Sequence, residues 1–464
     1  MHYNYNLLRD AYFSTGGFET GSYLERHKRE TDEDYRTRQK IAHYPNYFAS
    51  IVNALVDPVF KRKPLRDYEG GASVFLEPFL QDVDGKGTSI ATFMKQSAII
   101  AKIYGVALIV VDNVTDDAPT VQDALDNRAF PYAYIVTPDN VEDYGLDRTG
   151  RLDYVRFREI ESIADGTINY RYTRFDRNGW QIWGAKGGKS EGEYPLGLVP
   201  VVPLFSRLLE QQTLFPAPEF MPLAKAAKAI YNYSSWLDEI LYNQTFPILT
   251  IQSLDAKDVT VGTNNALGYS PDCSHAPAFI APPSDPANVL LSKIAQTVQE
   301  MYRMASLSFV GDNPSTASGV ARQWEFERTN QQLANFAAQC AAAETQVMNI
   351  FARWVGSEIN YTVSYPQDFG IVDLAAELTE AQAVLDMGLT HGLSEEVLKR
   401  VLAAYCPDIS DERFDELVEE LRQEEIDRQN AEKEMQANFA AGSIEDKNEN
   451  DQPPGEVSKI ELTD

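Results

Sequence analysis

The sequence predicts an α+β chain that is mostly helical, and three observations carry this prediction. A helical stripe of apolar residues runs through residues 318–354, segments of alternating polarity fill residues 130–205, and 44% of all residues are hydrophobic. At 464 residues, this composition supports a sizeable core and two to four structural units. No apolar run reaches the ~18 residues that a bilayer span requires, so we expect no membrane segment.

The first part of the chain is expected to alternate helix and strand. A charged stretch turns apolar with one large apolar residue every four positions from Tyr47 to Val59, and Pro58 and Pro64 are expected to end that helix. A second helix is predicted over residues 89–104. It runs through Gly105 into VALIVVD, a segment whose β-branched content predicts a buried strand.

Residues 130–205 read as one strand region. Four segments, PYAYIVTPDNV, LDYVRFREI, TINYRYTRF and WQIWGAK, alternate apolar with polar residues and are separated by Asp, Asn and Gly. Asn178-Gly179 predicts a hairpin because this dipeptide tolerates positive φ. VPVVPLF is expected to close the region as an edge strand, since proline has no backbone N–H to donate to a neighbouring strand.

Two helices follow, over residues 222–245 and from Asp285 onward. The segment between them, residues 246–283, is rich in Asn, Gly and Pro. A strand, INYTVSYP, and small acidic helices are expected after Gly356. From Gly442 the chain is polar and charged, and we expect it to be disordered because it cannot bury enough apolar area.

The longest helix carries the most informative pattern. Apolar residues recur on one face in a heptad-like series. The series comprises Phe326, Leu333, Phe336, Cys340, Val347, Ile350 and Trp354. A helix over residues 318–354 is roughly 55 Å long at ~1.5 Å per residue. One domain is not expected to surround such a rod, so we interpret the series as a seam between neighbouring copies of the chain.

Composition excludes several classes of protein. The three cysteines are far apart, which argues for a reducing compartment and against a disulfide framework. With no CxxC and five histidines, a zinc site is not expected, and the sequence indicates no metal or cofactor. The net charge of −28 offers no basic patch for gripping phosphates. This negative charge fits an ordinary acidic protein, or a surface that lies close to DNA without binding it tightly.

Several segments imitate functional motifs. Gly184-Ala-Lys-Gly-Gly-Lys-Ser190 resembles a phosphate-binding loop, but its spacing is one residue short and no helix follows, so a hairpin loop is favoured. In residues 170–174, tyrosine and arginine alternate, which fits either base stacking with phosphate contacts or an exposed strand with cross-strand pairs. Lone His43 and His275 have no nucleophile in pattern with them. Nothing in the sequence supports an enzyme.

The ordered set of elements resembles the portal proteins of tailed bacteriophages, over about residues 23–425. The pieces that carry the resemblance are HYPNYFASIVNALVDPVFKRKP, IAKIYGVALIVVD, FPYAYIVTPDNVEDY, FMPLAKAAKAIYNYSSWLDEILYNQTFPILTIQ, SLSFVGDNPSTASGVARQWEFER and MGLTHGLSEEVLKRVLAAYCPDISDERFDELVEEL. The resemblance implies residues 1–221 as N-terminal arm and α+β wing, 222–245 and 284–309 as stem helices, 246–283 as clip, 310–318 as tunnel loop, 319–356 as long wing helix, 357–441 as helical crown and 442–464 as tail. The short segment between the stem helices departs from the family's pattern.

The resemblance also implies a function. Portal proteins form a ring, typically of twelve subunits, at one capsid vertex of the virion, through which double-stranded DNA passes during packaging and ejection. Such a ring docks the packaging terminase and later the head–tail adaptor, and it contacts the major capsid protein or scaffold. The tunnel loop would face DNA through Gly311, Asp312, Asn313, Pro314, Ser315, Thr316 and Ser318. Two other classes stay open: a different assembly protein, such as an adaptor or scaffolding subunit, and a DNA-processing enzyme.

Overall fold

The structure, a computed structural model, is α+β as predicted. It describes residues 3–68, 74–113, 118–184, 187–207, 213–245, 248–250, 275, 278–280, 285–307, 319–367, 369, 413, 416–417, 419–420 and 423. The chain divides into two compact units, Met1–Gly370 and Ile371–Asp464. The elements below belong to the first unit. Most of the expected clip and crown, and all of the tail, lie outside the described residues.

Three capped helices open the chain. Helix α1 (Tyr5–Phe13), helix α2 (Asp32–Ile41) and helix α3 (Tyr47–Lys61) each begin after a polar residue whose side chain accepts a backbone N–H of the first turn. The expected N-terminal arm is therefore partly a packed helix, because α1 contacts α3, α5 and α7.

The prediction that Pro58 ends helix α3 is wrong. Pro58 lies inside the helix, which continues to Lys61. Proline removes one helical hydrogen bond and crowds the preceding turn. The next turn is nevertheless retained, since Val59 is fully buried and Phe60 packs against the core.

A three-stranded sheet lies at the centre of this unit. Its order is β3 (Tyr132–Val136), β2 (Val106–Asp112) and β9 (Val201–Phe205), all antiparallel. β9 is an edge strand, as its prolines predicted. Helix α5 (Ile90–Tyr104) leads into β2. It begins after the Ser89 cap and ends at Gly105, whose φ of 89° suits glycine.

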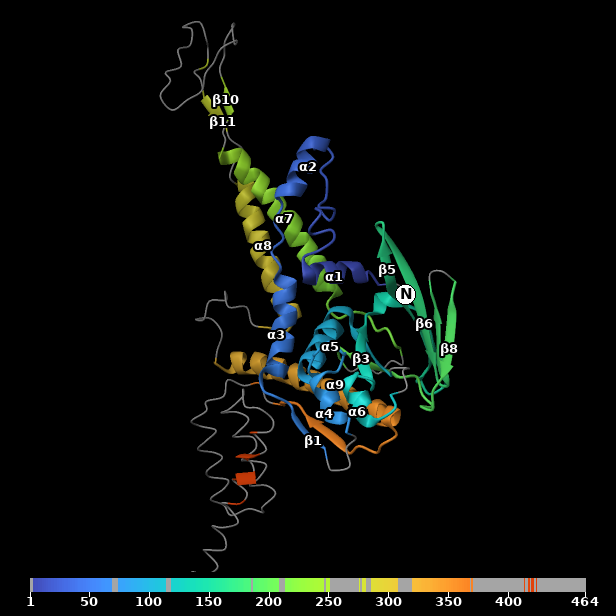
Figure 1. Cartoon of the computed structure of the whole chain (residues 1–464). Coiled ribbons are helices and arrows are strands. Elements are labelled where there is room, and N and C mark those ends of the chain that lie inside the picture. The colour runs from blue at the N-terminus through green and yellow to red at the C-terminus, as the bar shows by residue number, and fades with distance from the viewer. Residues whose placement is uncertain are drawn as a thin grey trace, which may run out of the picture. The chain divides into compact units, whose positions relative to one another are not determined.

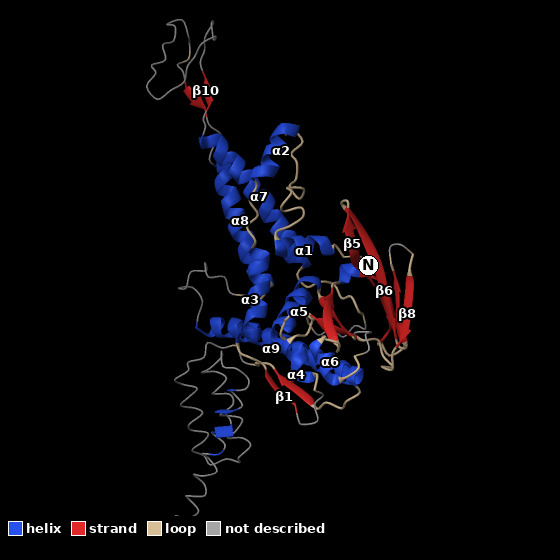
Figure 2. Ribbon diagram, in the orientation of Figure 1, coloured by secondary structure: helices blue, strands red, loops and turns tan. Residues whose placement is uncertain are grey.

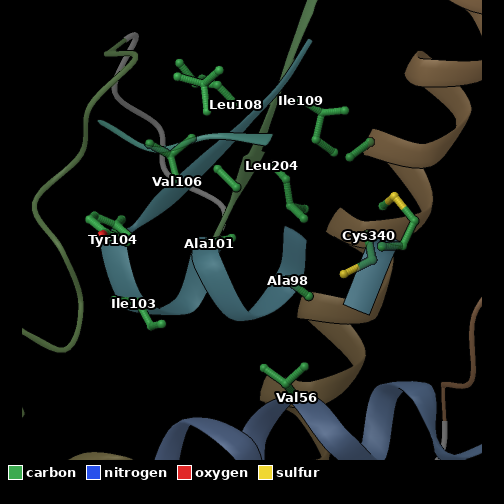
Figure 3. Close-up of a cluster of buried hydrophobic side chains, with 14 of the residues drawn as sticks. Val56, Ala98, Ala101, Ile103, Tyr104, Val106, Leu108, Ile109, Leu204 and Cys340 are labelled. Carbon is green, nitrogen blue, oxygen red and sulfur yellow. The ribbon is translucent and has the colours of Figure 1, made fainter. Parts of the chain in front are cut away.

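The core gathers around α5 and β2. Figure 3 shows side chains of α5, β2 and β9 converging with Val56 of α3 and Cys340 of the long helix α9 (Gly319–Val355). The six residues from Val106 to Val111 are all fully buried, which explains the uninterrupted apolar run of that strand. Short helices α4 (Leu76–Gln81), α6 (Val121–Asp126) and the 3-10 helix η1 (Pro138–Asn140) complete this region.

A second, separate sheet is a five-stranded meander (Figure 2). Its strands are β4 (Val141–Leu146), β5 (Leu152–Ala164), β6 (Thr167–Asp176), β7 (Gly179–Trp183) and β8 (Lys189–Glu193). The predicted single strand region is thus two sheets. The phosphate-loop imitation is the β7–β8 hairpin, as favoured: the Gly184 N–H donates to the Gly188 carbonyl at 2.9 Å.

The β6–β7 hairpin is present, but not for the predicted reason. Neither Asn178 nor Gly179 has positive φ. Instead, the Asp176 carboxylate accepts the N–H groups of Asn178 and Gly179 at 2.9 and 3.1 Å. Glycine is required at 179 because a Cβ there would lie 2.1 Å from the Gly192 carbonyl oxygen of the neighbouring strand.

Helices α7 (Met221–Thr245) and α8 (Asp285–Met304) run side by side (Figure 1). Between them the described residues include the small antiparallel pair β10 (Ile248–Thr250) and β11 (Ala278–Ile280). After α9, strand β12 (Tyr361–Ser364) pairs with β1 (Leu65–Tyr68), far away in sequence.

Candidate assembly surface

The α7–α8 hairpin consists of these two packed helices. It is anchored to the rest of the first unit at the start of α7. Leu223, Ala227 and Ile230 are buried. The Tyr231 hydroxyl donates to the Phe18 carbonyl at 3.0 Å, and the Asn232 side chain accepts from the Glu25 N–H at 2.7 Å. These bonds tie the first half of α7 to the N-terminal segments.

A buried, ion-paired arginine of α2 joins this helix to α7. The Arg38 guanidinium contacts Glu30 at 2.7 Å, donates to the Ser235 hydroxyl at 3.2 Å and donates to the Glu25 carbonyl at 2.8 Å. The Arg38 hydrogen bonds lower the pKa of the Glu30 carboxyl. Because both side chains are buried, removing either one would leave the charge of the other without compensation. The sequence of this charged stretch gave no sign of a buried pair.

The distal end of the hairpin is different. The α7 stripe that is buried at Leu223 and still buried at Leu237 becomes exposed at Leu241, which is 47% accessible. On α8, Val298 and Met301 are buried while Val289 and Leu291 are 67% and 52% exposed. One end of the hairpin therefore presents large apolar side chains on both helices, a feature of interaction surfaces.

Helix α9 is held by a buried carboxylate. Glu344 is fully buried and accepts from Arg66 at 2.8 and 3.2 Å, from Tyr365 at 2.6 Å and from Tyr361. Burial alone would lower the pKa of Arg66, but the adjacent Glu344 charge raises it above its ordinary value. This cluster joins α9 to the β1–β12 pair.

A buried lysine of α5 packs against another part of α9. The Lys102 ammonium donates to the Ser206 carbonyl at 2.9 Å and lies 4.2 Å from the centroid of the Phe336 ring. Burial lowers the pKa of Lys102, while Glu219 at 3.7 Å opposes that shift. Both Lys102 and Glu344 fall in phase with apolar faces of their helices. A charged residue in such a phase is the signal that would have predicted these clusters.

The predicted seam is corrected by this packing. Its residues Leu333, Phe336, Cys340, Val347 and Ile350 are buried among side chains of the same chain. Trp354 packs against that core, and its indole N–H donates to the Val111 carbonyl at 2.9 Å. The first unit covers the apolar face of this half of the helix, because α3, α5, β2, β9 and β12 all contact it. The Phe326 side chain lies outside the described residues.

The joint between α8 and α9 is built on Ser306. Its hydroxyl accepts from Arg328 at 2.8 Å and from Gln332 at 3.2 Å, and its carbonyl accepts from the Thr329 hydroxyl. The expected tunnel loop, including Gly311, Asp312, Asn313, Pro314, Ser315, Thr316 and Ser318, lies outside the described residues.

One groove of the first unit brings together no catalytic set of residues. It has a volume of about 550 Å³ and lies between the β4–β5 turn, β9 and α9. Two of its arginines are already engaged: Arg177 with Asp147, and Arg353 with the Leu196 carbonyl at 3.1 Å. Among the described residues there is no acidic, His or Cys cluster that would hold a metal ion, and no helix long and apolar enough to cross a bilayer.

Comparisons with known proteins give structural likenesses alone. No protein-family profile and no curated protein matches the chain. A chain from the neck of a native gene transfer agent particle with C12 symmetry is 12% identical, covers 76% of this chain and 88% of its own length, and gives a TM-score of 0.41. A chain from the virion of the native particle is also 12% identical, with coverages of 86% and 99% and a TM-score of 0.41. One from the neck of an empty particle with C6 symmetry is 11% identical, with coverages of 75% and 88% and a TM-score of 0.40. Likenesses this weak leave function to be argued from the chain's own residues.

Proposed function

We propose that this chain is the portal protein of a tailed-phage-like particle, a ring subunit through which double-stranded DNA enters and leaves the capsid. The observation that carries the proposal is the α7–α8 hairpin with its exposed apolar end. The next helix along the chain is the long helix α9, whose apolar face is buried in the first unit. This is the order of stem helices and wing helix that the sequence resemblance implies. In that reading β10 and β11 belong to the clip.

We propose assembly into a ring through the same surface, with twelve copies as is typical of that family. Contacts between different patches of successive copies close into rings. A ring multiplies the −28 charge of one chain, and an acidic channel keeps DNA from adhering to its wall. The proposed partners are the terminase, the major capsid protein or scaffold, and the head–tail adaptor, and the proposed location is the capsid vertex of the virion.

The ring is tested by substitution at the distal end of the hairpin. Val289→Asp with Leu291→Asp is expected to leave the chain folded, because both side chains are exposed, but to prevent assembly by placing charge in an apolar contact. Mass photometry and negative-stain images would show rings for the wild type and monomers for the variant. Val121→Asp, at a site 54% exposed on α6, is the control. A wild-type chain that stays monomeric at micromolar concentration would refute the ring.

The role of residues 310–318 remains part of the proposal. We place this segment at the narrowest part of the channel, where Ser315 and Thr316 offer weak phosphate contacts and Asp312 opposes tight binding. Replacing Asp312 and Asn313 by tryptophan is expected to preserve the ring but reduce the DNA packaged per particle. Wild-type packaging in that variant would make the segment an ordinary connector, with Ser318 as a helix cap.

A further inference from the structure

Strands β5 and β6 extend beyond their neighbours as a two-stranded ribbon. β4 pairs with β5 only as far as Phe157, and β7 pairs with β6 only as far as Tyr172. Past these points the described strands pair only with each other, up to the Ala164–Thr167 turn. Two strands alone are marginally stable in water, so the faces of such a ribbon need support.

The polar face of the ribbon turns toward its own fold. Arg171 contacts Glu159 at 2.8 Å, and Thr173 on the same face is buried and donates to Glu159 at 3.1 Å. The Glu159 side chain is only 20% exposed. Burial raises the pKa of Tyr134 on β3, and the charge of Glu159 raises it further. The inward face is therefore the charged one.

The outward face of the ribbon is apolar. Side chains alternate across a strand, so the partners of the inward residues point away from the fold. We call these outward residues the ribbon face: Ile160, Ile163, Ile168, Tyr170 and Tyr172. Ile163 lies opposite Ile168 and is 68% exposed, and Ile160 is 57% exposed. A sheet with one solvated face normally places polar residues there, so this ribbon has the reverse polarity.

Arginines continue the same face toward the centre of the meander. Arg156 lies opposite Arg174, and Arg158 lies opposite Tyr172. Arg174 stacks over the Tyr154 ring at 4.2 Å, and Arg158 contacts Glu142 at 3.4 Å. Within the described part of the chain, Arg156 and Arg174 form no ion pair, and the Nε atoms of all three arginines are buried without a hydrogen-bond partner. This face of the two strands is therefore apolar near the turn, which we call the tip, and carries arginines where it meets the meander.

We infer that the ribbon face docks on an acidic and apolar surface of the next copy of this chain. The inference rests on the proposed ring and adds one of its contacts. The chain has 69 acidic and 41 basic residues, so the surface of another copy is on average complementary to the arginines. Nucleic acid is disfavoured as the occupant, because exposed isoleucines offer nothing to phosphate and the whole chain repels it. The tyrosine–arginine alternation therefore belongs to a protein contact.

The first test weakens the tip without adding charge. Ile163→Thr with Ile168→Thr keeps β-branched side chains and so the strand preference. We expect the concentration for half-assembly to rise by at least about tenfold, as for contacts central to an interface. The thermal unfolding midpoint of the unassembled chain should not change. Ile41→Thr, at a site 56% exposed on α2, is the matched control, and an equal shift in that control would overturn the inference.

The second test leaves the ribbon otherwise native. A photo-crosslinking residue, p-benzoylphenylalanine, replaces Ile163, and the assembled protein is irradiated. Covalent pairs of chains support the inference. Rings that yield no covalent pair, or that crosslink to added DNA instead, overturn it while leaving the proposed function intact. If the unsubstituted chain forms no ring at any concentration, the proposed function itself fails.

Discussion

Replacing Glu344 by alanine is expected to lower the free energy of unfolding of the first unit by about 3–5 kcal/mol, the usual effect of removing one partner of a buried pair. The loss leaves the Arg66 guanidinium, which is 11% exposed, without its counter-charge. It also leaves the hydroxyls of Tyr361 and Tyr365 without the acceptor that both now share. Chemical denaturation followed by circular dichroism measures the change.

Two further variants distinguish the loss of this cluster from the general effect of a substitution on helix α9. Glu327→Ala removes an exposed glutamate from the same helix and should change stability by less than about 0.5 kcal/mol. Glu344→Gln keeps an acceptor but not the charge, so it should fall between the wild type and Glu344→Ala. Equal stability of Glu344→Ala and the wild type would show that the cluster contributes nothing to the fold.

Replacing Phe336 by alanine is expected to cost a similar amount, about 3–5 kcal/mol, because a fully packed aromatic ring leaves a cavity. Phe336 is 2% exposed, and its ring is the face on which the buried Lys102 ammonium rests. The lysine would lose that contact while remaining desolvated. Phe13→Ala, which truncates a ring that is 52% exposed, is the control.

This variant also distinguishes the core from a subunit seam. A core residue lowers the unfolding midpoint of the unassembled chain, and the decrease is the same at any protein concentration. A seam residue would leave the monomer as stable as the wild type and weaken assembly alone. An unchanged monomer midpoint for Phe336→Ala would restore the interpretation that the stripe faces a neighbouring copy.

The elements that sequence patterns predicted well are those determined locally. Helix α5 spans Ile90–Tyr104, close to the predicted residues 89–104, and Ser89 and Gly105 cap its two ends. Helix α7 and helix α9 also follow their apolar periodicity over nearly the predicted lengths. Period and caps act within a few residues, so they can be interpreted without knowing the rest of the fold.

The features that were missed are pairings between distant segments. The strand after Gly356 was predicted and is present as β12, but its partner β1 was not predicted. Leu65 pairs with Ser364, and no local pattern in either segment indicates the other. The division of residues 130–205 into two sheets is equally non-local, because β9 joins β2 instead of the meander. Pro58 shows the same limit, since tertiary packing overrides a local helix-breaking signal.

The candidate site was predicted in outline and misjudged in detail. The apolar periodicity of α9 was correct, but its burial within one chain could not be inferred, because periodicity defines a face and does not identify what covers it. The charged residues that hold α9 and α5 were overlooked for a related reason. Glu344 and Lys102 interrupt apolar stripes, which signals a buried charge but does not identify the partner that such a charge needs.

The hydrogen bonds at Ser306 have a consequence for how the protein can vary. Because Arg328 and Gln332 fasten the end of α8 to α9, the two helices are joined independently of residues 308–318. A segment whose ends are already held adds little closure entropy when its length changes. Insertions, deletions and new side chains between Leu307 and Gly319 should therefore be tolerated by the fold. That tolerance would let selection, or an engineer, alter this segment for a different cargo without redesigning the subunit around it.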